Sequence, residues 1–262
     1  CFAVSIHAYA VMSNHLHIVV QLAPDAAAAW NDADVAARWV RLFPPREEAD
    51  AAVDAKCSRL IADPERLQRI RGRLCDLSWL MRCLAEPIAR RANREDGCKG
   101  RFWEGRFKAQ RLCDERALLA AMTYVDLNPV RAGIVERLHD AAHTGATARL
   151  SQANRTPEVL SRPLGPILGV PRPALAMSTA DYLHLLDWTG RALAPGKKGR
   201  ISGDAPAALR RFESDPARWT TRVRGIGSGY WRVVGSAEAL IALAERIGQQ
   251  WLRGLRLAER LG

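Results

Sequence analysis

The chain has 262 residues, which is enough for one large domain or two small ones with a buried core. Its 39 Lys and Arg residues outnumber 28 Asp and Glu residues, giving a net charge of +11 and a pI of about 10.0. This surplus indicates a polyanionic partner such as nucleic acid, since Lys and Arg neutralise phosphates and release counterions; a basic surface without a specific partner is the alternative. No apolar run approaches the length that spans a bilayer, so we expect no membrane partner.

The six cysteines form no C-x-x-C pair, which argues against a zinc ribbon or a thioredoxin-type site. The chain is also too long and too poor in cysteine for a disulfide-stapled secreted scaffold. We therefore expect free thiols in a reducing cytoplasm. The sequence starts at Cys1 inside an apolar stretch, without the features of a signal peptide, and we expect its true N-terminus to lie upstream.

A β-hairpin is the first predicted element. Residues 2–12 alternate loosely, Ser13 and Asn14 signal a turn, and residues 15–22 form the second strand. No Asp, Glu, Lys or Arg occurs before Asp25, which predicts a central, buried pair of strands.

Two histidines lie on this second strand. His15 and His17 share one face because successive side chains of a strand alternate, and Leu16, Ile18 and Val20 share the other, which we expect to be buried. Two imidazoles about 7 Å apart on a rigid strand can converge on one metal ion. A pair of ordinary histidines on a half-buried strand is the alternative.

Helices are predicted next. Residues 25–75 read as mostly helical, interrupted at Pro44 and Pro45, and carry no chemical motif, so we interpret them as an insertion or a helical cover. Residues 76–94 give a stronger helix. Its apolar positions recur at three- and four-residue spacing: Leu77, Leu80, Met81, Leu84 and Ile88.

A basic, aromatic segment follows at residues 99–111. Its candidate DNA-binding residues are Arg101, Trp103, Arg106 and Lys108. Basic side chains hold a phosphate backbone, and aromatic rings offer bases a stacking surface. The alternative is a strand over residues 106–112 with core aromatics and solvent-facing charges.

The next helix is predicted to begin after the N-cap Asp114 and to end at Pro129. Its core stripe consists of Leu118, Leu119, Met122 and Val125. A second stripe consists of Ala117, Ala121, Tyr124 and Asn128. This stripe should be open, because small residues lead up to one phenol and one amide. Such a phenol is suited to reach another group, although an ordinary half-buried tyrosine is the alternative.

Three motifs in this order resemble the single-tyrosine HUH transposases, and most closely the REP-associated tyrosine transposases. They are residues 124–133 (YVDLNPVRAG), the Met-x-Asn-His-x-His run at residues 12–17, and residues 100–109 (GRFWEGRFKA) between them. The resemblance covers residues 1 to about 140.

The resemblance implies a ferredoxin-like α+β fold, an antiparallel sheet with helices on one face. Family members normally begin with a further strand and helix, which this sequence lacks. They cut and rejoin single-stranded DNA, often at hairpins of palindromic repeats, in the bacterial cytoplasm. Carried over, His15 and His17 would bind Mg²⁺ or Mn²⁺, Tyr124 would be the nucleophile, Asn128 would complete the metal site, and Arg131 would contact DNA.

We therefore expect a transposase domain at residues 1–140 with a helical insertion at about 25–75, a linker at 141–176, and a mainly helical extension at 177–262. Residues 236–261 should form one amphipathic closing helix with Ile247 and Trp251 in its apolar stripe. The run from Gly225 to Gly229 is not expected to be a phosphate loop, because no strand–turn–helix context surrounds it.

Three functions remain open. The first is a metal-dependent DNA strand transferase. The second is a truncated or domesticated relative that binds hairpin DNA without cutting it. The third is a metal-dependent hydrolase that uses the two histidines with a carboxylate, although no Asp or Glu lies near that pair in the sequence.

Overall fold

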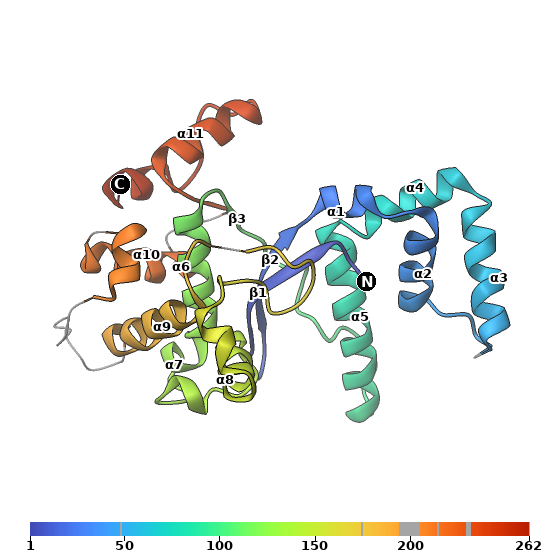
Figure 1. Ribbon diagram of the computed structural model, residues 1–262, viewed down its shortest axis with the longest axis horizontal. Helices are drawn as coiled ribbons and strands as arrows, with labels where there is room; N and C mark the ends of the chain where they lie inside the picture. The colour runs from blue at the N-terminus through green and yellow to red at the C-terminus, as the bar shows by residue number, and fades with distance from the viewer. Residues whose placement is uncertain (48, 174, 194–204, 214, 229–231, 262) are drawn as a thin grey trace. The chain divides into compact units, whose positions relative to one another are not determined.

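The computed structural model describes residues 1–262 apart from 48, 174, 194–204, 214, 229–231 and 262 (Figure 1). The chain is a mixed α/β protein with 58% helix and a small two-stranded antiparallel sheet, as the sequence predicted at this coarse level. It divides into two compact units: residues 1–5 with 21–108, and residues 6–20 with 109–262. No helix among the described residues is both long and apolar enough to cross a membrane.

The predicted hairpin is confirmed as β1 (Val4–Val11) and β2 (Leu16–Leu22). The Met12 amide donates to the His15 carbonyl oxygen at 2.9 Å and closes the turn. The predicted burial of β2 is wrong. Val19, on the face of His17, is only 5% exposed, whereas Leu16 is half-buried and Leu22 is 41% exposed. The histidine side of β2 is therefore the side that joins the core.

The first unit is helical, as predicted for residues 25–75. Its helices are α1 (Pro24–Ala29), α2 (Asp32–Leu42), α3 (Asp50–Ile61), α4 (Pro64–Arg73) and α5 (Leu77–Glu95). The Asp76 side chain accepts from the Trp79 amide at 2.8 Å, which confirms the predicted start of α5. The apolar stripe of α5 is at most half-buried, and Ile88 is 38% exposed.

All helices and strands after residue 109 belong to the second unit. They are β3 (Arg111–Leu112), α6 (Glu115–Asp126), α7 (Asn128–Arg131), α8 (Gly145–Arg155), α9 (Thr179–Leu193), α10 (Pro216–Ser228), β4 (Val233–Val234), α11 (Ala237–Arg246) and α12 (Leu255–Leu261), with 3₁₀ turns at Leu138–Asp140, Pro157–Ser161 and Ala207–Arg211. Strands β3 and β4 pair in parallel. Helix α6 packs against α9 and α10 (Figure 1).

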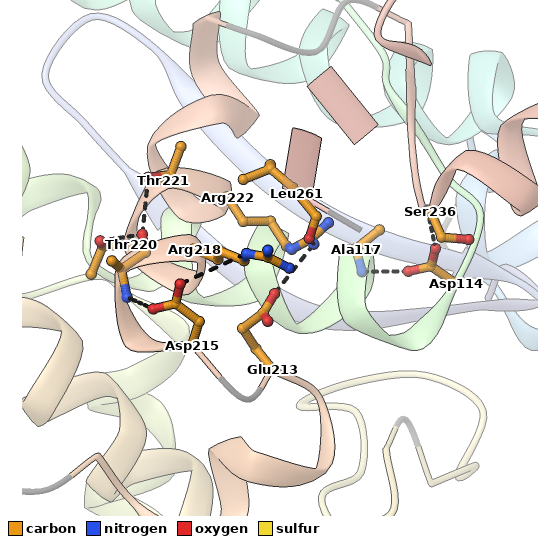
Figure 2. Close-up of polar contacts among 11 residues, drawn as sticks. Asp114, Ala117, Glu213, Asp215, Arg218, Thr220, Thr221, Arg222, Ser236 and Leu261 are labelled. Atoms are coloured by element: carbon orange, nitrogen blue, oxygen red, sulfur yellow. Dashed lines mark hydrogen bonds and ion pairs between the residues drawn. The ribbon is translucent and has the colours of Figure 1, made fainter. Parts of the chain in front are cut away.

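Helix α6 begins at the predicted N-cap. One oxygen of Asp114 accepts from the Ala117 amide at 2.7 Å, and the other accepts from the Ser236 amide at 2.5 Å (Figure 2). The core stripe is as predicted for Leu119 and Met122, which are fully buried. The start of α6 is thus held by a residue more than a hundred positions later in the chain.

Residues 141–176, expected as a loose linker, are instead well packed. They include α8 and contribute buried Ala146, Leu164 and Leu175 to the core. Bridges from Thr144 and Leu168 pair with the free edge of β1. These contacts give the polar backbone of the segment hydrogen-bond partners, which composition alone does not reveal. The domain boundaries at 140 and 176 stay predictions.

The predicted single helix over residues 236–261 is wrong. The chain forms α11 and α12, separated by a loop in which Gly248 and Gly254 adopt positive φ angles of 68° and 111°. These angles are incompatible with a right-handed helix and favour glycine. Gly225 to Ser228 belong to α10, so this part of the glycine-rich run is helical rather than a phosphate loop.

Buried charges connect α10 with α12. Arg222 is 2% exposed and pairs with Glu213 at 3.3 Å, and its guanidinium also donates to the Leu261 carbonyl oxygen at 3.0 Å (Figure 2). A buried guanidinium requires such partners, because an unpaired charge in the core is strongly unfavourable. This cluster fixes the orientation of α10 within the second unit.

A buried carboxyl at the end of α6 makes stability depend on pH. Asp126 is fully buried, accepts from the Tyr182 hydroxyl at 2.7 Å and from the Ala146 amide at 3.1 Å, and burial raises its pKa from 3.8 to about 7. Between those values the folded protein keeps a proton that the unfolded chain has lost. Its free energy of unfolding should therefore fall by a few kcal/mol as pH rises through this window.

Asp126→Asn should flatten that pH dependence, because the amide has no proton to lose. Urea unfolding of both proteins from pH 4 to 7.5 measures the difference. The exposed Asp187→Asn variant is the control and should keep the slope of the original protein. Equal slopes for the original protein and Asp126→Asn would contradict the assignment.

Candidate functional site

The two histidines lie side by side at the start of β2. Their ring centroids are 4.8 Å apart and the ring planes are nearly perpendicular, at 89°. The His15 Nδ1 hydrogen bonds to the Asn14 side-chain oxygen at 2.6 Å. Because that oxygen can only accept, the neutral ring in this geometry is the tautomer that donates from Nδ1 and has its lone pair on Nε2. The pair thus presents imidazole nitrogens on one side of the strand.

Helix α6 brings Tyr124 to this pair. The ring centroids of His17 and Tyr124 are 5.8 Å apart, with an angle of 88° between the planes. The Arg131 guanidinium carbon lies 4.2 Å from the centre of the Tyr124 ring, within range of a cation–π contact. Two of the predicted motifs, far apart in sequence, therefore meet in the second unit.

The electrostatics of this cluster favour a neutral His17. Burial lowers the pKa of His17, and the neighbouring His15 and Arg131 lower it further. A neutral imidazole is the form that binds a metal ion. A neutral ring therefore leaves its nitrogen free of a proton, whereas the Arg131 charge opposes a bound cation as it opposes the proton.

Asn128 lies just after the helix that carries Tyr124, not on it. It begins α7, after α6 has ended with its C-cap at Leu127, and is 6% exposed. The prediction of an open stripe is wrong here: Ala117 and Ala121 are 1% and 4% exposed. Small side chains allow another helix to approach α6 closely, and α10 does so.

Gly227 on α10 is a site residue that the sequence did not suggest. A methyl group at this position would collide with the Tyr124 hydroxyl and would lie 2.9 Å from the ring carbon that carries it. The phenol therefore rests against the backbone of α10, where only glycine leaves room. No spacing rule connects residues 124 and 227, so only the fold reveals this contact.

The donor set fits a divalent cation in part. His15 and His17 offer two nitrogens, and Asn128 is the predicted third ligand. Within the described ranges, no group of three or more His, Cys, Asp and Glu residues gathers in one place. Among the described residues, a further ligand would therefore be a group other than a carboxylate, thiolate or imidazole, such as the Asn128 amide.

The other predicted DNA-binding residues belong to the first unit. Arg101, Arg106 and Lys108 are exposed on the segment after α5. Trp103 is half-buried and donates its ring N–H to the Ala85 carbonyl oxygen at 2.9 Å, so it anchors this segment to α5.

The exposed rings of the segment are instead Phe102 and Phe107, at 43% and 37%. The alternative strand over residues 106–112 is limited to Arg111 and Leu112. Exposed phenyl rings between basic side chains are compatible with stacking on unpaired bases.

No family model, curated protein or solved structure matches the chain. The chemistry of the site therefore rests on its own residues, which contact one another in the order His15, His17, Tyr124 and Arg131. Such a set can hold a cation, bind an anion and supply an oxygen nucleophile.

Gly227→Ala should destabilise the protein by about 1–3 kcal/mol, because the added methyl overpacks against Tyr124. In a Tyr124→Ala background the same change should be neutral or stabilising, since alanine favours helix by about 1 kcal/mol over glycine. Denaturant unfolding of the four proteins gives the coupling between the two residues.

Gly72→Ala is the matched control, because Gly72 is also helical and has nothing within 4 Å of an added methyl group. It should stabilise the protein in either background. If Gly227→Ala behaves like Gly72→Ala while Tyr124 is present, the contact does not exist in solution.

Proposed function

We propose that the chain is a transposase of the single-tyrosine HUH class, which cleaves and rejoins single-stranded DNA through a 5′-phosphotyrosine. The observation that supports this most is the meeting of His15, His17 and Tyr124 within ring-contact distance. The ferredoxin-like arrangement belongs to the same proposal, with β1 and β2 as two strands of its sheet.

Tyr124 would attack the scissile phosphorus in line with the leaving oxygen. The bond between the phenol oxygen and phosphorus forms, the bond from phosphorus to the 3′ oxygen breaks, and the phenol proton is transferred to leave a free 3′-OH. The phosphotyrosine keeps the energy of the broken ester. A second 3′-OH can therefore reverse the step and join a new strand without water.

His15 and His17 would hold the divalent cation, with Asn128 as the proposed third ligand. When bound, the cation withdraws charge from the phosphate, which compensates for the weak nucleophilicity of a phenol at neutral pH. Imidazole nitrogen is a softer ligand than oxygen, so Mn²⁺ fits this pair better than Mg²⁺. Arg131 adds a fixed positive charge over the phenol ring.

DNA would be held by exposed basic side chains, among them Arg101, Arg106 and Lys108, with Phe102 and Phe107 as stacking surfaces. The hydrolase hypothesis is weaker, because no carboxylate joins the histidine pair in a three-residue group within the described part of the chain. The alternative hypothesis is a truncated or domesticated relative that binds hairpin DNA without cutting it. The adduct assay described next distinguishes it from the proposal.

Tyr124→Phe should abolish the covalent adduct with labelled single-stranded DNA in Mn²⁺, because the nucleophilic oxygen is gone, while DNA affinity changes less than about threefold. Denaturing gels measure the adduct and gel shifts measure binding. Tyr9→Phe, which changes another half-buried tyrosine of the second unit, should keep the adduct. An adduct in Tyr124→Phe would refute the role, and binding without an adduct in the original protein would favour the second hypothesis.

His15→Ala and His17→Ala should each weaken Mn²⁺ binding about tenfold or more, because each removes one of two nitrogen ligands. Isothermal titration of the protein without DNA measures this directly. His184→Ala changes an exposed histidine on α9 and should leave Mn²⁺ affinity unchanged. Equal affinities for all variants would show that the pair does not bind the ion.

A further inference from the structure

The loop between α11 and α12 exposes a tryptophan. Leu252 points into the protein, is 8% exposed and belongs to a small core cluster with Leu243 and Ala244. Its neighbour Trp251 is 67% exposed, although the sequence had predicted it as a core residue. Gly248 follows the end of α11 and Gly254 precedes the start of α12, and both adopt positive φ angles. A well-anchored loop therefore presents a large aromatic ring to solvent.

This ring lines an open hollow of about 620 Å³, within the size range of small-ligand sites. The residues around it are Arg232, Val233, Gln249, Gln250, Trp251, Leu252 and Arg253. The hollow thus combines an apolar floor, an aromatic face, two guanidinium groups and two amides. It contains no carboxylate among these lining residues.

We propose that this hollow binds one unpaired nucleotide of single-stranded DNA. The base would stack on Trp251, the phosphate would lie near Arg232 and Arg253, and the amides of Gln249 and Gln250 would meet the base edge. Aromatic rings recognise bases of any sequence, and guanidinium groups recognise phosphate. A duplex would not fit, because its bases are already stacked on one another. The choice of single-stranded DNA as the source of this nucleotide rests on the proposed function.

The hollow is directly connected to the helix that carries Tyr124. The Arg111 amide donates to the Arg232 carbonyl oxygen at 2.6 Å, and the Cys113 amide to that of Val234 at 2.8 Å. Asp114 then caps α6. A nucleotide held beside Arg232 would therefore be anchored on the same β3–β4 pair from which α6 starts, which would help to set the register of the strand.

The test uses the full chain with Tyr124→Phe, so that covalent capture cannot contribute, and a short fluorescein-labelled oligothymidylate. Trp251→Ala should weaken binding by roughly tenfold, and Trp251→Phe should restore most of it. Arg232→Ala should reduce the slope of log affinity against log salt by about 0.7, the value for one phosphate contact to a single strand. Arg210→Ala, an exposed arginine outside the hollow, should weaken binding less.

Direct contact is tested by a 5-iodouracil in the oligonucleotide, which should cross-link to the peptide that contains Trp251; a duplex of the same sequence should not compete. Unchanged affinity of Trp251→Ala together with the absence of this cross-link would overturn the proposal. Failure of the transferase proposal is distinguishable, because it would appear as a missing Tyr124 adduct while Trp251-dependent binding persists.

Discussion

Helix α6 is fixed at both ends by Asp side chains, and the geometry around Tyr124 depends on this. At its start, Asp114 accepts from its own first turn and from Ser236. At its end, Asp126 accepts from Ala146 and Tyr182. Both side chains thus reach parts of the chain that follow later in sequence. A helix of this length would fray if it were isolated, so tertiary contacts must keep Tyr124 beside His17.

The cluster at Tyr124 combines two imidazoles with one guanidinium. His17 and Arg131 lie against the Tyr124 ring, and burial together with repulsion from His15 and Arg131 lowers the pKa of His17. The lowered pKa of His17 disfavours a second positive charge next to the Arg131 guanidinium. The cluster thus offers imidazole nitrogen to a metal ion and a guanidinium to phosphate.

Short sequence patterns predicted the secondary structure around the site, but not which distant segments pack against it. The turn at Asn14, the alternation of His15 and His17 and the cap at Asp114 follow from short-range rules, and these elements form as expected. The buried face of β2 and the closure over Tyr124 by Gly227 depend on segments distant in sequence. Neither periodicity nor spacing carries that information.

The C-terminal helices belong to the same unit as Tyr124, and one of them, α10, lies against its ring. A buried ion pair such as Arg222–Glu213 stabilises little by itself, since desolvation offsets the attraction, but loss of either partner would leave an uncompensated buried charge. Its additional bond to Leu261 fixes α12 against α10. With α10 oriented in this way, Gly227 meets the phenol of Tyr124. Helix α10 is therefore part of the wall around the proposed nucleophile, and α12 supports it through the bond from Arg222 to Leu261.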